Sequence, residues 1–268
     1  MNVGIRAVVV GVMTWGLHGC APPALRAAHS IDKGEVAFEL GQAIDFSGHQ
    51  SKLLTLTGDD ALPLRESPTI HAMAVMGLGA GFEVGTGSGL MVKYSVLDER
   101  RHDTPLSVAL MAQTPLFEFL GPGTHFDMSA GILLSQHAQL GKSVALRPVL
   151  NLMYSQRDYQ ATAAVPEALT DPDAPVSEPE MWTEMNYRGI DIPLGIELPI
   201  SVGEKLALAP TFSYTYSVPL NVEAGDFICS GCAFAVDVFE MGTPMQLWFG
   251  LKLQPKLRPV PGGSNDGL

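Results

Sequence analysis

Apolar and polar residues alternate along most of the chain beyond residue 34. In KLALAPTFSYTYS, residues 205–217, the large apolar side chains share one face and the small or polar side chains share the other. This period of two is typical of a β-strand whose faces meet different surroundings. The pattern recurs at residues 35–46, 69–78, 82–87, 90–96, 104–113, 124–134, 143–157, 188–200, 205–217 and 243–253. We therefore predict an all-β protein of about ten strands.

Charged residues indicate which face meets which surroundings. On these strands they fall on the face of small residues: Glu35, Glu39, Asp45, Glu83, Lys93, Asp127, Arg147, Asp191, Glu197, Lys205 and Lys252. An Arg or Lys facing mid-bilayer lipid costs about 2–4 kcal/mol in a membrane barrel, so this separation is expected where the apolar face contacts lipid. A soluble, lipocalin-like barrel has its apolar face inside, but its outer face would normally carry many Lys and Glu residues.

The connections between the predicted strands alternate in length. Those at 78–81, 98–104, 139–142 and 201–204 are short or moderate, whereas those at 47–66, 114–123, 156–186 and 218–242 are longer. Transmembrane barrels alternate short periplasmic turns with longer external loops in this way. Residues 87–89, Gly-Ser-Gly, are the exception and require a tight external hairpin. We predict an antiparallel up-and-down transmembrane β-barrel over residues 35–254, with a flexible tail at 255–268.

Composition agrees with a membrane barrel and argues against some functions. The chain of 268 residues has a net charge of −12, which argues against binding to nucleic acid. Charged residues make up 16%, below the roughly 25% of ordinary soluble domains. No apolar run after residue 20 is long enough for a transmembrane helix. The 28 Gly and 20 Pro residues favour β structure with many turns.

The N-terminus has the features of a secretion signal. MNVGIR contains one cation, and residues 7–19 contain no Asp, Glu, Lys or Arg, which suits a signal peptide at 1–19. Leu17-His18-Gly19-Cys20 resembles the lipobox of bacterial lipoproteins. The resemblance implies cleavage before Cys20, lipidation of its thiol and a periplasmic linker at 20–34. An ordinary signal peptide followed by a chance cysteine is the alternative.

The whole arrangement resembles small bacterial outer-membrane β-barrel proteins. The likeness rests on GLGAGFEVGTGSGLMVKYSVL and on the strand openings LALAP and ALRP. It implies a monomer embedded in outer-membrane lipid and implies no particular activity. The sequence departs from a regular barrel at four strand prolines, Pro148, Pro193, Pro199 and Pro210.

The inward-facing charges form the first candidate site. We predict that Arg147 and Lys93 pair with Glu83, Asp127, Asp191 and Glu197, because buried charges need partners. A narrow ten-stranded lumen filled in this way would be closed to free diffusion.

The cysteine pair Cys229 and Cys232 is the second candidate site. In an exported protein these residues are expected to close a small disulfide loop. A redox motif requires a βαβ context, which the strand pattern does not provide. A zinc site requires further Cys or His ligands, and none lie close in the sequence. We predict neither a metal nor a cofactor.

Catalysis is not expected. His125, Asp127 and Ser129 alternate on one strand, but residues at this spacing lie about 6.5–7 Å apart. A nucleophile and its base need about 2.6–3.2 Å, so the three cannot form a self-contained triad. The leading hypothesis is an outer-membrane barrel lipoprotein with a structural or surface-interaction role through its external loops. The alternatives are a narrow channel or small-ligand-binding barrel, including a tethered periplasmic one, and a membrane-embedded hydrolase.

Overall fold

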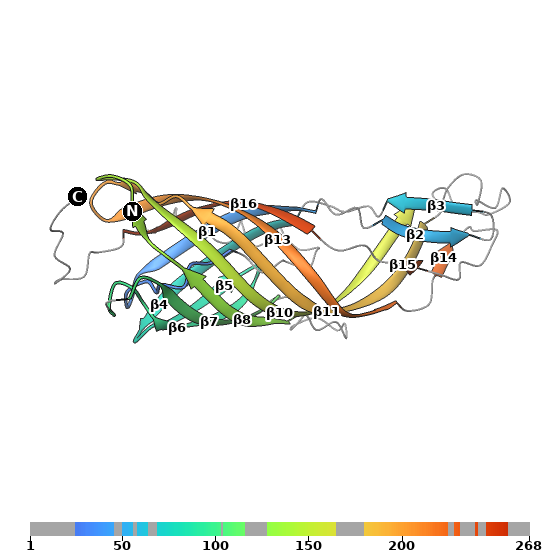
Figure 1. Ribbon diagram of the computed structural model, residues 1–268, viewed down its shortest axis with the longest axis horizontal. Helices are drawn as coiled ribbons and strands as arrows, with labels where there is room; N and C mark the ends of the chain where they lie inside the picture. Colours follow the sequence, from blue (N-terminus) through green and yellow to red (C-terminus); the bar gives the residue numbers. More distant parts are fainter. Residues whose placement is uncertain are drawn as a thin grey trace, which may run out of the picture.

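Ten antiparallel strands close into a barrel in the computed structural model (Figure 1). The structure describes residues 25–45, 50–55, 58–63, 69–102, 104–115, 128–164, 180–224, 228–230, 239–240 and 245–256. The barrel strands are β1 (Val36–Asp45), β4 (Thr69–Gly79), β5 (Phe82–Gly87), β6 (Gly89–Leu97), β7 (Ser107–Pro115), β8 (Met128–Ser135), β10 (Ala145–Ala164), β11 (Glu180–Glu197), β13 (Leu206–Ala224) and β16 (Met245–Pro255). Each pairs with the next in this order, and β16 pairs with β1. The predicted up-and-down barrel is confirmed.

The apolar face of the barrel points outward, as the alternation predicts. Along β13, Leu206, Phe212, Tyr214 and Tyr216 are exposed, whereas the alternate residues Ala207, Ala209, Thr211, Ser213, Thr215 and Ser217 are buried. The same outward position is taken by Phe38, Leu40, Leu78, Phe82, Val92, Leu110, Ile132, Leu152, Leu194, Phe249 and Leu251. A soluble barrel with its apolar face inside is therefore contradicted. The architecture is that of an outer-membrane barrel. Within the described residues, no helix is long and apolar enough to cross a membrane.

The tight hairpin predicted at residues 87–89 is present. β5 and β6 are two separate strands that pair directly, with Thr86 opposite Leu90. Gly87 has φ 149°, and a Cβ there would lie 2.1 Å from the Ala72 carbonyl oxygen. The Ser88 hydroxyl also bonds to the backbone of Ala72, which ties the hairpin to β4.

Three strands are longer than predicted and form an external extension. β10, β11 and β13 have 20, 18 and 19 residues, whereas about 9–11 tilted residues span a bilayer. The connections predicted at 156–186 and 218–242 are therefore strand over much of their length, because the β10–β11 ladder continues to Ala164 opposite Glu180. Residues of high β-propensity such as Tyr159 and Trp182 support this continuation.

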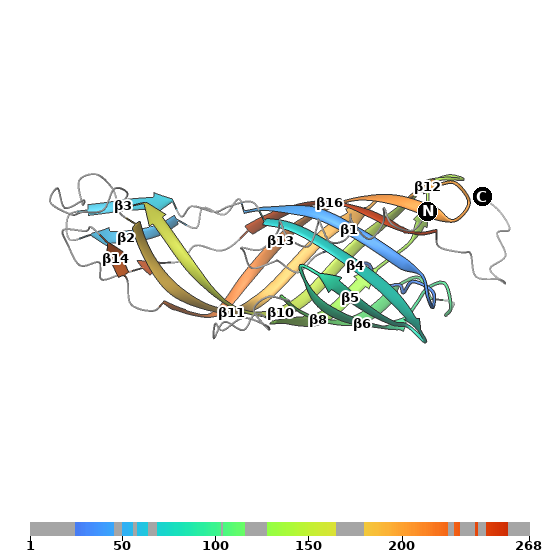
Figure 2. The same cartoon turned by 180° about the vertical axis from the view of Figure 1, so that it is seen from behind.

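Short strands complete the two ends of the molecule. β2 (Gln50–Thr55), β3 (Gly58–Pro63) and β15 (Phe239–Glu240) form a separate sheet, and β14 (Ile228–Ser230) pairs with β11. They lie at the end of the molecule where the extension projects (Figure 2). β12 (Ile200–Val202) lies at the opposite end, which carries the short turns (Figure 2), and β9 (Ala138–Gln139) pairs with the first residues of β10. We call this opposite end the turn end; it corresponds to the periplasmic side of such barrels.

Candidate functional site

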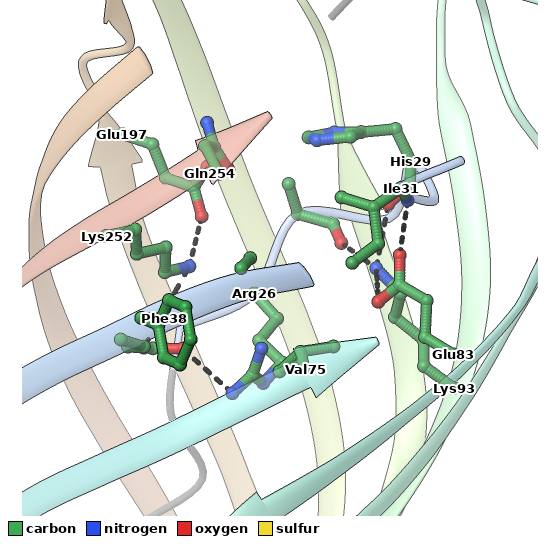
Figure 3. A pocket seen from close by; sticks show the side chains of 13 residues that line it. Arg26, His29, Ile31, Phe38, Val75, Glu83, Lys93, Glu197, Lys252 and Gln254 are labelled. Carbon is green, nitrogen blue, oxygen red and sulfur yellow. Dashed lines mark hydrogen bonds and ion pairs between the residues drawn. The ribbon is translucent and has the colours of Figure 1, made fainter. Parts of the chain in front are cut away.

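The chain that precedes β1 lies inside the barrel. All seven residues of Leu25–Ile31 are buried, with exposed fractions of 0–7%. We call this segment the N-terminal plug. It belongs to the stretch 20–34 that the sequence predicts as a periplasmic linker, and the structure instead places it among lumen side chains (Figure 3).

The plug enters the lumen at the turn end. The backbone N–H of Gly34 donates to the Gly77 carbonyl at 2.8 Å, and Gly77 donates to the Glu35 carbonyl at 3.0 Å. A Cβ at Gly77 would lie 2.3 Å from the Asp32 carbonyl oxygen. Gly77 therefore provides the space in which the base of the plug passes close to β4.

Each backbone carbonyl from Leu25 to Ser30 accepts a hydrogen bond from a side chain outside the plug. The ammonium of Lys252 donates to Leu25 at 2.6 Å, and that of Lys93 donates to Ala27 at 3.0 Å and His29 at 2.7 Å. The Ser95 hydroxyl donates to Ala28 at 2.8 Å, and the Arg100 guanidinium donates to Ser30. The Asn151 amide donates to Arg26 at 3.2 Å when its NH2 group is turned toward the acceptors around it. The wall thus satisfies the backbone acceptors of a chain that forms no ladder of its own.

Backbone donors of the plug also find partners in side chains. The Ala28 N–H donates to the Ser135 hydroxyl at 2.8 Å, and the Ile31 N–H donates to the Glu83 carboxylate at 2.6 Å. The Ser30 N–H lies 3.3 Å from the Asp98 carboxylate.

A proline lies opposite Asn151 in the neighbouring strand. The β10–β11 ladder has no partners at Asn151 and Leu152, which lie opposite Pro193 and Ile192 respectively. Pro193 has no N–H to donate, so the ladder is interrupted where Asn151 faces the lumen. Pairing resumes on both sides of this gap, so Pro193 is compatible with a closed barrel.

Three ion pairs join residues that lie directly opposite each other on adjacent strands. Glu83 on β5 faces Lys93 on β6, and their charged atoms lie 2.9 Å apart. Arg147 on β10 faces Glu197 on β11, with 3.4 Å between charged atoms. Glu39 on β1 faces Lys252 on β16, with 4.0 Å between their charged atoms. Opposite charges at such positions stabilise a sheet.

The plug and a shared lysine complete this network. Arg26 of the plug contacts the Glu39 carboxylate at 2.8 Å, and Lys252 also pairs with Glu197. Among the described strand residues, the buried carboxylates are Glu39, Glu83, Asp191 and Glu197, and the buried cations are Lys93, Arg147 and Lys252. Arg26 therefore supplies a fourth cation to four carboxylates.

The structure brings together only part of the predicted charge set. The predicted pairs of Lys93 with Glu83 and of Arg147 with Glu197 form, whereas Asp191 accepts a hydrogen bond from Ser217. Asp127 lies outside the described residues. Three members were missed: Glu39, Lys252 and Arg26. The closure of β1 on β16 could have placed the first two, because both were already assigned to the inward face.

Most of the other predicted site residues lie outside the residues that the structure describes. Cys20 and Cys232 lie outside the described residues, while Cys229 lies in β14 opposite Met181, so the disulfide stays a prediction. His125, like Asp127, lies outside the described residues. The predicted signal peptide at 1–19 and residues 257–268 of the predicted tail lie outside them as well.

The third residue considered for catalysis, Ser129, lies in β8 and faces inward. Its hydroxyl lies 2.9 Å from the hydroxyl of Ser155 on β10. Among the described residues, no group of three or more His, Cys, Asp or Glu side chains could hold a metal ion.

A small cavity with both charged and apolar lining residues remains between the plug and the wall. Its volume is about 40 Å³, and its lining includes Arg26, Glu39, Glu83, Lys93 and Lys252 (Figure 3). This volume suits a few water molecules, whereas pockets for small organic ligands are about 300–1,000 Å³. The cavity therefore does not favour the ligand-binding-barrel alternative.

Charged groups near the base of the plug, outside the membrane-spanning strands, have shifted pKa values. Burial raises the pKa of Asp98, but hydrogen bonds and the charge of Arg100 outweigh it and hold that pKa below its ordinary value. Burial and the positive charge of Arg147 lower the pKa of His137. Burial raises the pKa of Glu99, although the His137 amide donates to its carboxylate.

Comparisons with known proteins assign no family. No family model matches the chain, and no curated protein matches it. Among solved structures, the chain is similar to the outer membrane protease OmpT from Escherichia coli, with 9% identity and a TM-score of 0.27. The match covers 83% of this chain and 92% of that chain. A similarity of this degree carries no argument about activity.

Proposed function

We propose that the protein is a non-conducting and non-catalytic outer-membrane barrel that acts at the cell surface through its external extension. The observation that carries the proposal is the occupied lumen. The plug and the ion pairs of the wall fill the space through which a solute would pass. The large feature that remains available to partners is the extension of β10, β11 and β13.

The size of the extension supports an interaction role. Beyond the 9–11 residues that cross a bilayer, each of these strands continues for roughly eight or more residues, or about 25 Å at 3.3 Å per residue. These strands pair with one another, since β11 pairs with both β10 and β13. A paired sheet at the external end presents a more rigid surface than an unstructured loop does.

We also propose that the mature chain is anchored by a lipid on Cys20, as the motif Leu17–Cys20 implies. Labelling of cells with radioactive palmitate should mark the wild-type chain and leave the Cys20→Ala variant unmarked. Equal labelling of both chains would contradict the anchor without affecting the barrel.

Photo-crosslinking on intact cells tests the surface role. A photoreactive amino acid is placed at Tyr159 or Trp182 in the extension, and a matched control carries it at Leu140 at the turn end. The proposal predicts cross-linked species of higher mass for the two extension positions. The Leu140 control should not form these species. Cross-linking from neither extension position would overturn the surface role.

Planar-bilayer recording tests the closed lumen. The purified chain should show no conductance above that of protein-free membranes. A steady open-pore conductance would favour the narrow-channel alternative.

A further inference from the structure

We infer that the barrel lumen is a binding site for an extended peptide, occupied in cis by Leu25–Ile31, and that a peptide supplied in trans can replace the bound segment. The inference rests on contacts inside the lumen and does not depend on the proposed role of the external extension.

The first support is that recognition is directed at the peptide backbone. Five of the six consecutive carbonyls from Leu25 to Ser30 accept hydrogen bonds from side chains outside the plug, and the sixth, that of Arg26, accepts one when the NH2 group of Asn151 is turned toward it. Two backbone N–H groups donate to Ser135 and Glu83 at 2.8 and 2.6 Å. Nearly every buried backbone group of the plug thus has its own side-chain hydrogen-bond partner. Such complete pairing indicates a specific binding site rather than a segment that only fills space.

The second support is that the donors come from strands all around the barrel. Lys252 lies on β16, Lys93 and Ser95 lie on β6, Asn151 lies on β10, and the acceptor Ser135 lies on β8. A segment that merely packed against one wall would contact neighbouring strands only. The plug instead runs through the middle of a ring of partners.

The third support is that the central side chains of the plug are small. Ala27, Ala28 and Ser30 add little side-chain bulk to recognition at these positions. The larger side chains make specific contacts: Arg26 meets the Glu39 carboxylate at 2.8 Å, and His29 Nε2 lies 3.2 Å from a guanidinium nitrogen of Arg147. Leu25 and Ile31 pack in buried apolar clusters. The ligand class is therefore an extended peptide with small central residues, apolar ends and a cation at the position of Arg26.

A cleavable plug tests this inference on the folded protein. A recognition site for a specific protease is inserted between Lys33 and Gly34, in an exposed turn at the base of the plug. After folding in detergent and cleavage, the mixture passes through gel filtration, and the N-terminal fragment is quantified by mass spectrometry. Heat modifiability of the barrel on gels checks that the barrel itself stays folded.

The expected result is that the fragment stays with the barrel and is displaced by an unlabelled synthetic peptide covering residues 25–33. A matched peptide carries N-methyl groups at Ala28 and Ile31. These remove the two N–H groups that donate hydrogen bonds to Ser135 and Glu83. This peptide should not displace the fragment. Loss of the fragment from a folded barrel directly after cleavage would overturn the inference, as would equal displacement by both peptides or none by either.

Two wall variants provide an independent measurement. Ser95→Ala and Ser135→Ala each remove one neutral hydrogen bond to Ala28 and should speed fragment loss about fivefold. Ser129→Ala is the control, since its hydroxyl pairs with Ser155, and it should leave the rate unchanged. Equal rates in all three variants would contradict backbone recognition by these hydroxyls.

Discussion

Removing the charge of Lys93 should destabilise the barrel more than removing the charges of Lys93 and Glu83 together. The two side chains lie directly opposite each other on β5 and β6, with 2.9 Å between charged atoms and at most 5% side-chain exposure. In Lys93→Met, the Glu83 carboxylate stays buried without its partner. Breaking a buried pair from one side costs about 3–5 kcal/mol, and the plug carbonyls of Ala27 and His29 also lose their donor.

The double variant Lys93→Met/Glu83→Gln lacks the unpaired charge. The amide oxygen that the second substitution introduces can still accept the Ile31 N–H, which donates to the Glu83 carboxylate at 2.6 Å in the wild type. What remains is the loss of donors to the plug, a cost of about 1–3 kcal/mol. The loss of donors to the plug is common to both variants, so the double variant should be more stable than the single variant by roughly 3–5 kcal/mol, the cost of the unpaired carboxylate.

Urea unfolding in phospholipid vesicles, followed by tryptophan fluorescence, measures these free energies. Wild type, both single variants and the double variant form a double-mutant cycle. A double variant that is no more stable than Lys93→Met would refute the reasoning, because it would mean that Glu83 is not a buried charge in need of a partner.

Three further predictions concern other parts of the barrel. Leu152→Lys places a charge on the outward face, 48% exposed, and should lower the unfolding free energy in vesicles by about 2–4 kcal/mol; an unchanged value would mean that this face does not meet lipid. Gly77→Val should push the base of the plug from the wall, because a Cβ there lies 2.3 Å from the Asp32 carbonyl oxygen, and protease cleavage near Asp32 should become faster than in wild type. Arg100 holds the pKa of Asp98 below its ordinary value despite burial, so the stability that this carboxylate contributes is present above the unfolded pKa of about 3.9 and is lost as pH falls below it. The stability advantage of wild type over Asp98→Asn should therefore shrink as the pH falls below about 4, and an advantage independent of pH would contradict this.

The barrel and its orientation could be predicted because they depend on local alternation. Along β13, Leu206 and Phe212 face outward while Ala207, Ala209 and Thr211 are buried on the inward face, and a period of two records that geometry in the sequence itself. The separation of charges then fixed which face meets lipid, since a misplaced charge there is costly. The same reasoning put Glu83, Lys93, Arg147 and Glu197 inside before their partners were known.

The external extension could not be predicted in the same way. Strands were expected to end where a bilayer ends, and the length of about 9–11 residues set that limit. Outside the membrane, the chain from Gln156 to Ala164 keeps its ladder to β11, but it no longer has to separate lipid from water. The strict alternation therefore weakens, and the segment reads as a loop.

The plug was missed for a different reason. Leu25–Ile31 shows no helix or strand period, and its partners, such as Lys93 and Lys252, lie 64 or more positions away in the chain. Its hydrogen bonds go to side chains whose inward direction exists only once the barrel has closed. No local pattern records such long-range contacts, so a segment of this kind resembles a linker in the sequence.

The lipid contact of the outward face is tested most directly by site-specific fluorescence along β10. Single cysteines at Val149, Leu150, Asn151, Leu152 and Met153 carry an environment-sensitive dye, and nitroxide-labelled lipids act as quencher in vesicles. The account predicts strong quenching at Leu150 and Leu152, which are exposed, and weak quenching at the other three positions, which are buried. Quenching in the opposite phase, or none above the level of a water-soluble quencher at Leu150 and Leu152, would contradict a barrel embedded in lipid.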